Sequence, residues 1–187
     1  MRTLFNQNSV VTNDPDSAHM FYRKHEGDLI YKPLKKGRIV RGNEQGLIFT
    51  NFVEPGLLDE FDKIKFAPCL LQKYIHKSLE LRVTVIGQIV FAVEIQSQQT
   101  PGSIHDWRRV QENLPHKLFH LPADLENKCR NLVKELGLQF GALDLIITPN
   151  NEYVFVEINP NGQWAWIQQL CPEIPLRESL ADLLIDS

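Results

Sequence analysis

Two short apolar segments joined by a polar loop decide the fold of this chain: ALDLIITPNNEYVFVEINPNG, residues 142–162. Residues 142–148 and 153–158 are rich in aliphatic and aromatic side chains, and Pro, Asn, Asn and Glu lie between them. Apolar segments of this length, separated by turn-forming residues, predict a β-hairpin. A four-residue loop would make Thr148 face Tyr153. This register then fixes which side chains meet along the rest of the hairpin.

The expected register places Asp144 directly opposite Glu157, and side-chain alternation puts Asn159 on the same face. Two like charges in a cross-strand pair destabilise a hairpin by up to ~1 kcal/mol, whereas a divalent cation between them would reverse that sign. Three oxygen ligands without Cys or His favour Mg²⁺, with Mn²⁺ as the alternative. A polar face that meets only solvent fits the same spacing. The turn Pro160-Asn161-Gly162 favours the metal, because it would fix the Asn159 amide.

The composition is that of an ordinary globular protein, with 187 residues, 43% hydrophobic and 23% charged. Such a chain can bury a core as one domain or as two small lobes. Lys and Arg number 20 against 23 Asp and Glu, a net charge of -3 that argues against an electrostatic nucleic-acid binder. No stretch resembles a signal peptide or a membrane span, and Cys69, Cys129 and Cys171 lack zinc-ligand spacing. We expect a reduced, cytoplasmic protein with neither nucleic acid nor a membrane as partner.

The remaining pattern predicts strand pairs with few helices, which favours an α+β fold over a doubly wound sheet. Expected helices cover residues 15–25, begun by Asp14 and Pro15, then 124–136, begun by Asp124, and 175–184. Expected strands cover residues 29–33, 47–52, 70–75, 81–86, 88–95, 142–148 and 153–158. Cys129 falls on the apolar face of its helix, which favours core packing over a reactive thiol.

Lys32 ends an expected strand directly before a basic, glycine-punctuated loop, residues 35–46. A lysine there suits phosphate oxygens, and the backbone at Gly37, Gly42 and Gly46 could close over them, although a lysine taken alone is more often a solvated strand end. The spacing of Gly37 and Gly42 superficially fits a Walker loop. Residues 43–44 are Asn and Glu where Lys and Ser or Thr must follow, which excludes that motif.

Two further charged groups suit either a ligand or the solvent. Glu80 and Arg82 lie on one strand face, where they could contact ribose hydroxyls and a phosphate, or form a surface ion pair. Residues 106–109, Asp-Trp-Arg-Arg, are either a functional loop or a solvated charge cluster. No Ser/His/Asp or Cys/His signature of a protein nucleophile occurs.

Six stretches, taken together, resemble the ATP-grasp superfamily, and in particular the microviridin-type ATP-grasp ligases that mature ribosomally made peptides. They are TNDPD (12–16), IYKPL (30–34), LELRVTV (79–85), DWR (106–108), GALDL (141–145) and EINPNGQW (157–164). The resemblance implies an ATP-grasp fold of two lobes, each with an antiparallel sheet and helices, that hold ATP between them. Residues 1–72 would form the smaller lobe, and residues 73–187 the larger lobe with the metal site.

The resemblance also implies a role for each matching residue. It assigns the α/β-phosphates to Lys32, adenine to the hinge Gln72, Lys73, Tyr74 and Ile75, ribose to Glu80, phosphate to Arg82, the acyl-phosphate and acceptor to Arg108, and magnesium to Asp144, Glu157 and Asn159.

In this family a carboxylate of a precursor peptide is activated as an acyl-phosphate and then joined to an amine or a hydroxyl. Family members carry an N-terminal domain, and a helix with a further lysine, ahead of the segment that begins here near Val11. The expected partners are therefore a precursor peptide and either a separate chain that supplies this domain or a second copy. The alternatives are a non-catalytic nucleotide- or peptide-binding module, a ligase that adds glutamate to a protein C-terminus, and an RNA contact through residues 35–38 and Arg41.

Overall fold

The computed structural model describes residues 8–34, 38–41 and 44–185. These residues form two compact units. The four-stranded unit comprises the described residues up to 76 and residues 100–111, and the five-stranded unit comprises residues 77–99 and those from 112 onward. The boundary between the smaller and the larger lobe is expected from the sequence between residues 72 and 73, and this boundary stays a prediction.

The four-stranded unit is built on an antiparallel sheet of strand order β1-β6-β2-β5. Its strands are β1 (Ser9–Thr12), β2 (Leu29–Lys32), β5 (Asn51–Phe52) and β6 (Cys69–Lys73). Helix α1 (Pro15–Lys24) and the 3-10 segment η1 (Pro55–Phe66) pack around a core that includes Leu29 and Leu71. A separate hairpin pairs β3 (Arg38–Arg41) with β4 (Glu44–Leu47).

Helix α1 begins and ends where its sequence signals lie. The Asp14 carboxylate accepts hydrogen bonds from the backbone N–H groups of Asp16 and Ser17, and Pro15 occupies the first turn. Just beyond the last turn, Gly27 has φ +85°, a left-handed conformation that glycine adopts without steric penalty. The helix predicted from these residues is confirmed.

The segment that follows β2 differs from its prediction. The sequence predicts a loop over residues 35–46 and a strand over residues 47–52, whereas the structure has the β3–β4 hairpin, a break and then the two-residue β5. The reason for the break is visible at Thr50, whose backbone N–H donates to Asp106 Oδ2 at 3.1 Å rather than to a neighbouring strand. A tertiary contact has replaced a ladder hydrogen bond.

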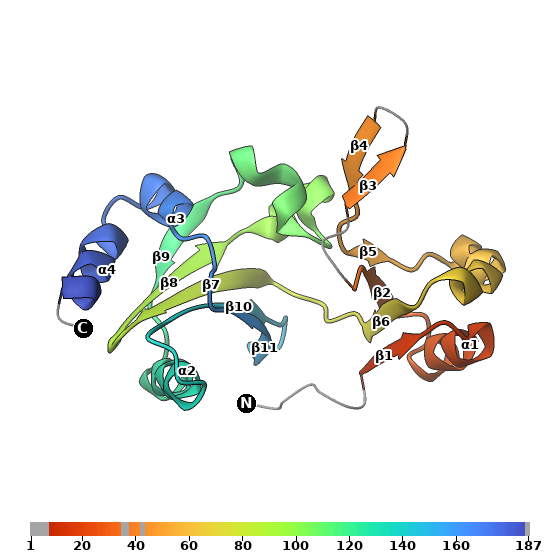
Figure 1. Ribbon diagram of the computed structural model, residues 1–187, viewed down its shortest axis with the longest axis horizontal. Helices are drawn as coiled ribbons and strands as arrows, with labels where there is room; N and C mark the ends of the chain where they lie inside the picture. The colour runs from red at the N-terminus through yellow and green to blue at the C-terminus, as the bar shows by residue number, and fades with distance from the viewer. Residues whose placement is uncertain (1–7, 35–37, 42–43, 186–187) are drawn as a thin grey trace. The chain divides into compact units, whose positions relative to one another are not determined.

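The five-stranded unit is an antiparallel sheet of order β11-β10-β7-β8-β9 with helices on both faces (Figure 1). Its strands are β7 (Leu79–Ile86), β8 (Ile89–Ile95), β9 (His116–Phe119), β10 (Phe140–Ile147) and β11 (Tyr153–Asn159). Helix α2 (Ala123–Glu135) covers one face, over Leu81 and Leu143. Helices α3 (Ala165–Leu170) and α4 (Leu176–Ile185) pack on the opposite face, against Ile86 and Val93.

The chain between β8 and β9 contains three 3-10 segments: η2 (Ser97–Gln99), η3 (Pro101–Ser103) and η4 (Trp107–Asn113). The sequence predicts this region as irregular and misses strand β9, which pairs with β8 from Ala92 to Ile95. Segment η1 is also absent from the sequence-based prediction. The predicted β7–β8 and β10–β11 hairpins are confirmed, whereas strand β1 and its pairing with β6 are also absent from the sequence-based prediction.

Helix α2 supplies the core of the five-stranded unit. Cys129 is 2% exposed, and burial, followed by the charge of Glu126, raises the pKa of its thiol to about 11, so its predicted packing role is confirmed. Asp124 is not the cap, because the helix begins after Pro122 and Asp124 lies in the first turn, 3.3 Å from Lys128 Nζ. Proline provides no side-chain cap, so the helix N-terminus relies on its acidic first turn.

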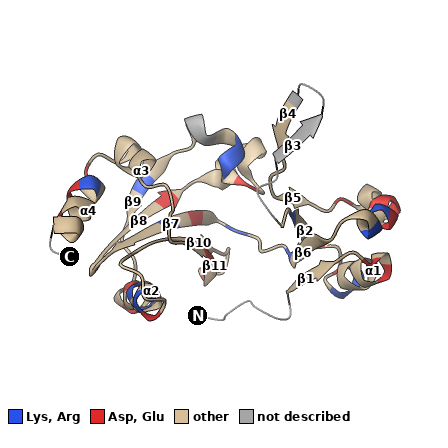
Figure 2. Cartoon of the chain, in the orientation of Figure 1, with Lys and Arg blue, Asp and Glu red and all other residues tan. Residues whose placement is uncertain are grey.

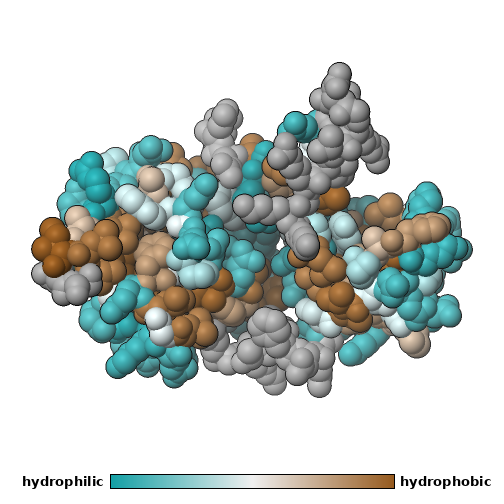
Figure 3. All heavy atoms as spheres, viewed as in Figure 1, coloured by the Kyte–Doolittle hydropathy of each residue, from teal (hydrophilic) through white to brown (hydrophobic). Residues whose placement is uncertain are grey.

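Helix α4 buries one side only. Leu176 is fully buried and Leu180 and Leu183 are partly buried, whereas Leu184 is 75% exposed and does not join the core. Apolar atoms are correspondingly exposed over the end of α4 (Figure 3). Within the described ranges, every helix is too short or too polar to span a bilayer.

Candidate functional site

The β10–β11 hairpin places the predicted metal ligands as neighbours. Asp144 pairs with Glu157, and Ala142 pairs with Asn159, so the two carboxylates meet across the ladder and the amide lies two residues along the same strand. In an antiparallel sheet, directly opposed side chains have Cβ atoms about 5 Å apart. The predicted pairing of Asp144 with Glu157 is confirmed.

The turn of this hairpin differs from its prediction. Ile147, not Thr148, pairs with Tyr153, and the register shifts between Asp144 and the next residue. The shift is a β-bulge that leaves Val156 as the extra residue of β11. The longer loop and the bulge offset one another, so the carboxylates face each other although the predicted loop is one residue too short.

Five candidate residues share the face of the five-stranded sheet that lies opposite α2: Glu80, Arg82, Asp144, Glu157 and Asn159. The alternating side chains of β7 and β10, which include Val83 and Leu143, are fully buried under α2. Acidic segments on β7 and β11 are visible in Figure 2. The sheet thus has one apolar face and one face where acids and a guanidinium gather.

Arg82 and Asp144 are cross-strand partners on this face. Arg82 Nε lies 3.0 Å from Asp144 Oδ1, as an ion pair without the alignment of a hydrogen bond at Nε. The Arg82 side chain is 11% exposed and the Asp144 side chain 24% exposed. The guanidinium therefore balances one of the two opposed carboxylates and is itself largely withdrawn from solvent.

The chain after β11 folds back over Arg82. The guanidinium lies 5.9 Å from the centre of the Trp166 ring, and His116 meets that ring edge-on at 5.3 Å. Burial lowers the pKa of His116, and the hydrogen bond to a backbone carbonyl opposes this only partly, so a neutral imidazole packs beside the cation. Gly162 is required here, because a Cβ would lie 2.4 Å from the Cβ of Ala142.

Asn159 is held by the turn that follows it. The backbone N–H of Asn161 donates to Asn159 Oδ1 at 2.9 Å, which fixes the orientation of the amide. The carbonyl oxygen has a second lone pair that can still face a cation. The turn therefore does what the sequence predicts for it.

The donor set suits a hard cation. Among the residues that the structure describes, no group of three or more His, Cys, Asp and Glu side chains gathers in a metal-binding arrangement. The candidate set is instead two opposed carboxylates and an amide, all oxygen donors, and such sets prefer Mg²⁺ when phosphate and water supply the remaining ligands. The residues present fit magnesium bound together with a phosphate chain.

Glu80 has a partner that the sequence analysis misses. Lys77 Nζ donates to Glu80 Oε1 at 2.6 Å, and the two side chains are 4% and 15% exposed. The sequence shows only that Lys77 precedes Glu80 by three residues, and their burial is known only from the structure. Glu80 is thus neither a surface residue nor the cross-strand partner of Arg82.

The other candidate residues lie in the four-stranded unit. Lys32 is half-buried at the end of β2, and Gln72 donates from Nε2 to Ser9 Oγ at 2.9 Å in the centre of the sheet. Lys73 is exposed at the end of β6, and Ile75 is half-buried beyond it. Of the glycines expected to close over phosphates, Gly37 and Gly42 lie outside the described residues, and Gly46 lies in strand β4, where it pairs with Ile39.

Tyr74 is a packing residue rather than an open binding surface. It is 7% exposed, and its ring lies 5.5 Å from Phe52, 5.4 Å from His105 and 4.9 Å from His76. Its backbone N–H donates to Asp28 O at 2.8 Å. The expected adenine hinge is therefore held in place by an aromatic cluster.

The loop with Arg108 is organised around a buried acid. Asp106 is 4% exposed, and its carboxylate accepts two side-chain hydrogen bonds from Arg108, at 2.8 and 2.7 Å, and one from Thr50 N–H. Burial alone would raise the pKa of Asp106, but the hydrogen bonds and charge of Arg108 outweigh it and hold the pKa below its usual value. Arg109 adds a hydrogen bond to Thr50 O at 3.0 Å. The alternative of a solvated cluster is wrong for Asp106.

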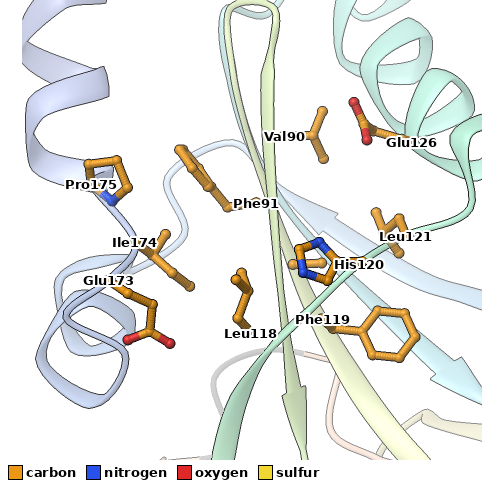
Figure 4. Close-up of a pocket in the computed structure, with 11 residues that line it drawn as sticks. Val90, Phe91, Leu118, Phe119, His120, Leu121, Glu126, Glu173, Ile174 and Pro175 are labelled. Carbon is orange, nitrogen blue, oxygen red and sulfur yellow. The ribbon is translucent and has the colours of Figure 1, made fainter.

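A cavity of about 280 Å³ lies away from the candidate residues. Figure 4 shows its walls, which come from β8, β9 and the segment before α4. Leu118, Ile174 and Pro175 give it an apolar lining, with Glu126 and Glu173 at the margin. No candidate residue named above lines it.

Solved structures match this arrangement over nearly the whole chain. An ATP-grasp ligase from Chryseobacterium gregarium, associated with a RiPP (a ribosomally made, modified peptide) and solved with ADP and a leader and core peptide, is 37% identical with a TM-score of 0.89. The match covers 95% of this chain and 54% of the ligase.

Two macrocyclases from Microcystis aeruginosa MRC also match. MdnC, bound with precursor peptide MdnA, is 33% identical with a TM-score of 0.82, over 95% of this chain and 56% of its own. MdnB is 31% identical with a TM-score of 0.70, over 96% of this chain and 53% of its own. The chain therefore spans about half the length of these proteins.

No family model and no curated protein matches the sequence. The predicted fold, a mixed α+β ATP-grasp fold with two antiparallel sheets, is confirmed by the strand order and by the matched structures. The chain has an ATP-grasp fold, and the solved structures that it resembles include an ATP-grasp ligase associated with a RiPP and two macrocyclases.

Proposed function

We propose that this chain carries the ligase chemistry of an ATP-dependent peptide maturase. A carboxylate of a ribosomally made peptide attacks the γ-phosphorus of ATP, the bond to the β-phosphate oxygen breaks, and ADP leaves. An amine or hydroxyl of the peptide then attacks the acyl carbon and loses its proton, and phosphate leaves. The product is an amide or an ester that closes a ring, and neither step requires a nucleophile from the protein.

The observation that carries the proposal is the polar face of the five-stranded sheet. Asp144, Glu157 and Asn159 would hold Mg²⁺, which when bound offsets negative charge on the phosphates that it bridges. Arg82, withdrawn from solvent between Asp144 and Trp166, would contact a phosphate oxygen with its preorganised guanidinium. Mn²⁺ has the same ligand preference and is the expected substitute.

The four-stranded unit contributes the remaining proposed contacts with the nucleotide. Lys32 suits a phosphate as a point charge, and the segment Gln72–Ile75 suits adenine, because the packed ring of Tyr74 fixes its backbone. Glu80, in the other unit, suits the ribose hydroxyls. A ligase of this superfamily solved with ADP supports a nucleotide as ligand.

Arg108 is the proposed contact with the peptide. Its side chain is 50% exposed although two of its nitrogens are fixed by Asp106, so its guanidinium is oriented and still accessible to a carboxylate or an acyl-phosphate. The matched structures that contain leader, core or precursor peptides support a peptide as substrate. A separate chain or a second copy as a further partner stays a prediction.

The test is ADP release with Mg-ATP and a precursor peptide rich in acidic residues, using the unaltered chain, Glu157→Gln and Glu152→Gln. Glu152 lies exposed in the loop of the same hairpin and is the matched control. We expect Glu157→Gln to lower turnover by at least about 100-fold, the effect of losing a charge that stabilises the reacting phosphates, and Glu152→Gln to leave it unchanged.

Mass spectrometry of the peptide separates the alternatives. Loss of water from one peptide supports a ring-closing ligase, whereas a gain in mass indicates addition of an amino acid such as glutamate. Saturable, magnesium-dependent ATP binding without ADP release would leave only the non-catalytic binding module.

A further inference from the structure

Lys77 and Glu80 form a buried ion pair at the start of β7. Lys77 Nζ donates to Glu80 Oε1 at 2.6 Å, and the Lys77 side chain is 4% exposed. Lysine is among the residues that proteins bury most rarely, and a fully buried lysine is paired with another group. A pair this enclosed at the edge of a proposed nucleotide site requires an explanation.

Neighbouring groups restrict both side chains. Across the sheet, Glu80 is flanked by Ile146 on β10 and Ile95 on β8, which cannot donate hydrogen bonds from their side chains. The backbone after Lys77 is fixed, because Ser78 N–H donates to the carbonyl oxygen of Ile147 at 2.7 Å. The ammonium and the carboxylate therefore hold one another between two isoleucines of the neighbouring strands, with Arg82 two residues along the same face of β7.

The geometry leaves Glu80 able to accept further hydrogen bonds. An ionised carboxylate has two oxygens and about four acceptor positions, and Lys77 occupies one of them. A neighbouring ammonium favours the ionised form, which accepts hydrogen bonds only. An oriented, acceptor-only carboxylate suits a pair of hydroxyl donors and repels phosphate oxygens.

We propose that Lys77 is a positioning residue for ribose recognition, which orients the Glu80 carboxylate so that the site distinguishes a ribonucleotide from one without ribose hydroxyls. The inference rests on the proposed function, because it requires that the ligand is a nucleotide. Lys77 acts through Glu80 and is not assigned a contact with the nucleotide.

The experiment compares the Kd of Mg-ATP with that of Mg-2′,3′-dideoxy-ATP by calorimetry. It uses the unaltered chain, Lys77→Met, and Lys128→Met as the matched control, because Lys128 also forms a lysine–carboxylate ion pair, on the exposed side of α2. We expect the unaltered chain and Lys128→Met to prefer ATP by at least about 10-fold, the scale of a lost hydrogen bond to a charged group. We expect Lys77→Met to reduce this preference to less than about 3-fold.

Each result decides a separate question. Failure of the unaltered chain to bind Mg-ATP contradicts the proposed function. Binding with the same ATP preference in folded Lys77→Met and in the unaltered chain overturns the role of Lys77 and leaves the proposed function standing.

A second measurement does not require that the Lys77→Met variant folds. In the unaltered chain, the ammonium NMR signal of Lys77, assigned from its loss in Lys77→Arg, should shift when Mg-ATP binds and shift less with the dideoxy analogue. Equal shifts with both nucleotides would overturn the proposal.

Discussion

Two aspartate–arginine pairs among the described residues are built in opposite senses. In the five-stranded unit Arg82 is the more buried partner, at 11% exposure, and Asp144 is 24% exposed. In the four-stranded unit the Asp106 side chain is 3% exposed and Arg108 is 50% exposed. The partner that stays accessible sets the charge that a ligand meets. Two pairs of the same composition therefore suit a cation in one unit and an anion in the other.

The largest effect is expected when the Arg82–Asp144 pair is broken at Asp144, its more accessible member. Asp144→Asn should weaken Mg-ATP binding by at least about 100-fold, which exceeds the 10–100-fold loss typical of changes to residues that only support metal ligands. The free energy of unfolding should change by less than ~1 kcal/mol. Calorimetry and urea unfolding measure the two effects. Glu152→Gln, in the exposed loop of the same hairpin, should change neither. Equal nucleotide affinity in Asp144→Asn and the unaltered chain would remove Asp144 from the metal site.

The same substitution in the Asp106–Arg108 pair should instead lower the stability of the fold. Asp106→Asn removes the charge that Arg108 faces and weakens the contact with Thr50, so we expect a loss of about 2 kcal/mol in the free energy of unfolding. Urea unfolding followed by circular dichroism measures it. A loss as small as that of Asp144→Asn would show that burial does not separate the two pairs.

Gly162 provides an intermediate effect next to the first pair. In Gly162→Ala the added Cβ would approach the Cβ of Ala142 to 2.4 Å, so the turn over Arg82 must shift, at a cost of about 1–3 kcal/mol. Gly56→Ala is the matched control, since no atom lies within 4 Å of its added Cβ. Thermal unfolding of the two variants should differ clearly, and similar midpoints would contradict the close approach.

The smallest expected effect is the pH dependence of the second pair. Because the folded pKa of Asp106 is lowered, its contribution to stability is present above the unfolded pKa of about 3.9 and is lost as the pH falls through the folded value. Urea unfolding between about pH 6 and about pH 3 should therefore show the unaltered chain and Asp106→Asn converging at low pH. A difference that stays constant across this range would mean that Asp106 does not titrate in this way.

The pairing of Asp144 with Glu157 could be predicted from the sequence, because local signals determine it. Alternation and turn residues give the strands of the hairpin, and Asp144 meets Glu157 whenever the loop and bulge lengths compensate. The bulge at Val156 could not be foreseen, because nothing in an apolar strand marks which residue is left unpaired. Helix α1 was equally predictable, since Asp14 and Gly27 mark its two ends.

What the sequence could not predict depends on contacts between distant residues. The strand expected through Thr50 is interrupted because Asp106 accepts the hydrogen bond of its backbone. Strand β9 forms because β8 offers a partner edge, although its own residues alternate weakly. Lys77 looked like one surface lysine among many, since the depth of its side chain becomes visible only when the sheet is assembled. The roles of the site residues remain predictions.

The membership of residues 100–111 has a genetic consequence. The chain passes between the two units at residues 76–77, 99–100 and 111–112, so the unit with α1 is encoded by two separated stretches of gene. Exchange of either unit by recombination would require three crossovers, and a cut after residue 76 alone would separate Thr50 from the aspartate that completes its hydrogen bonding. Because the two units alternate along the polypeptide, we expect them to be inherited together.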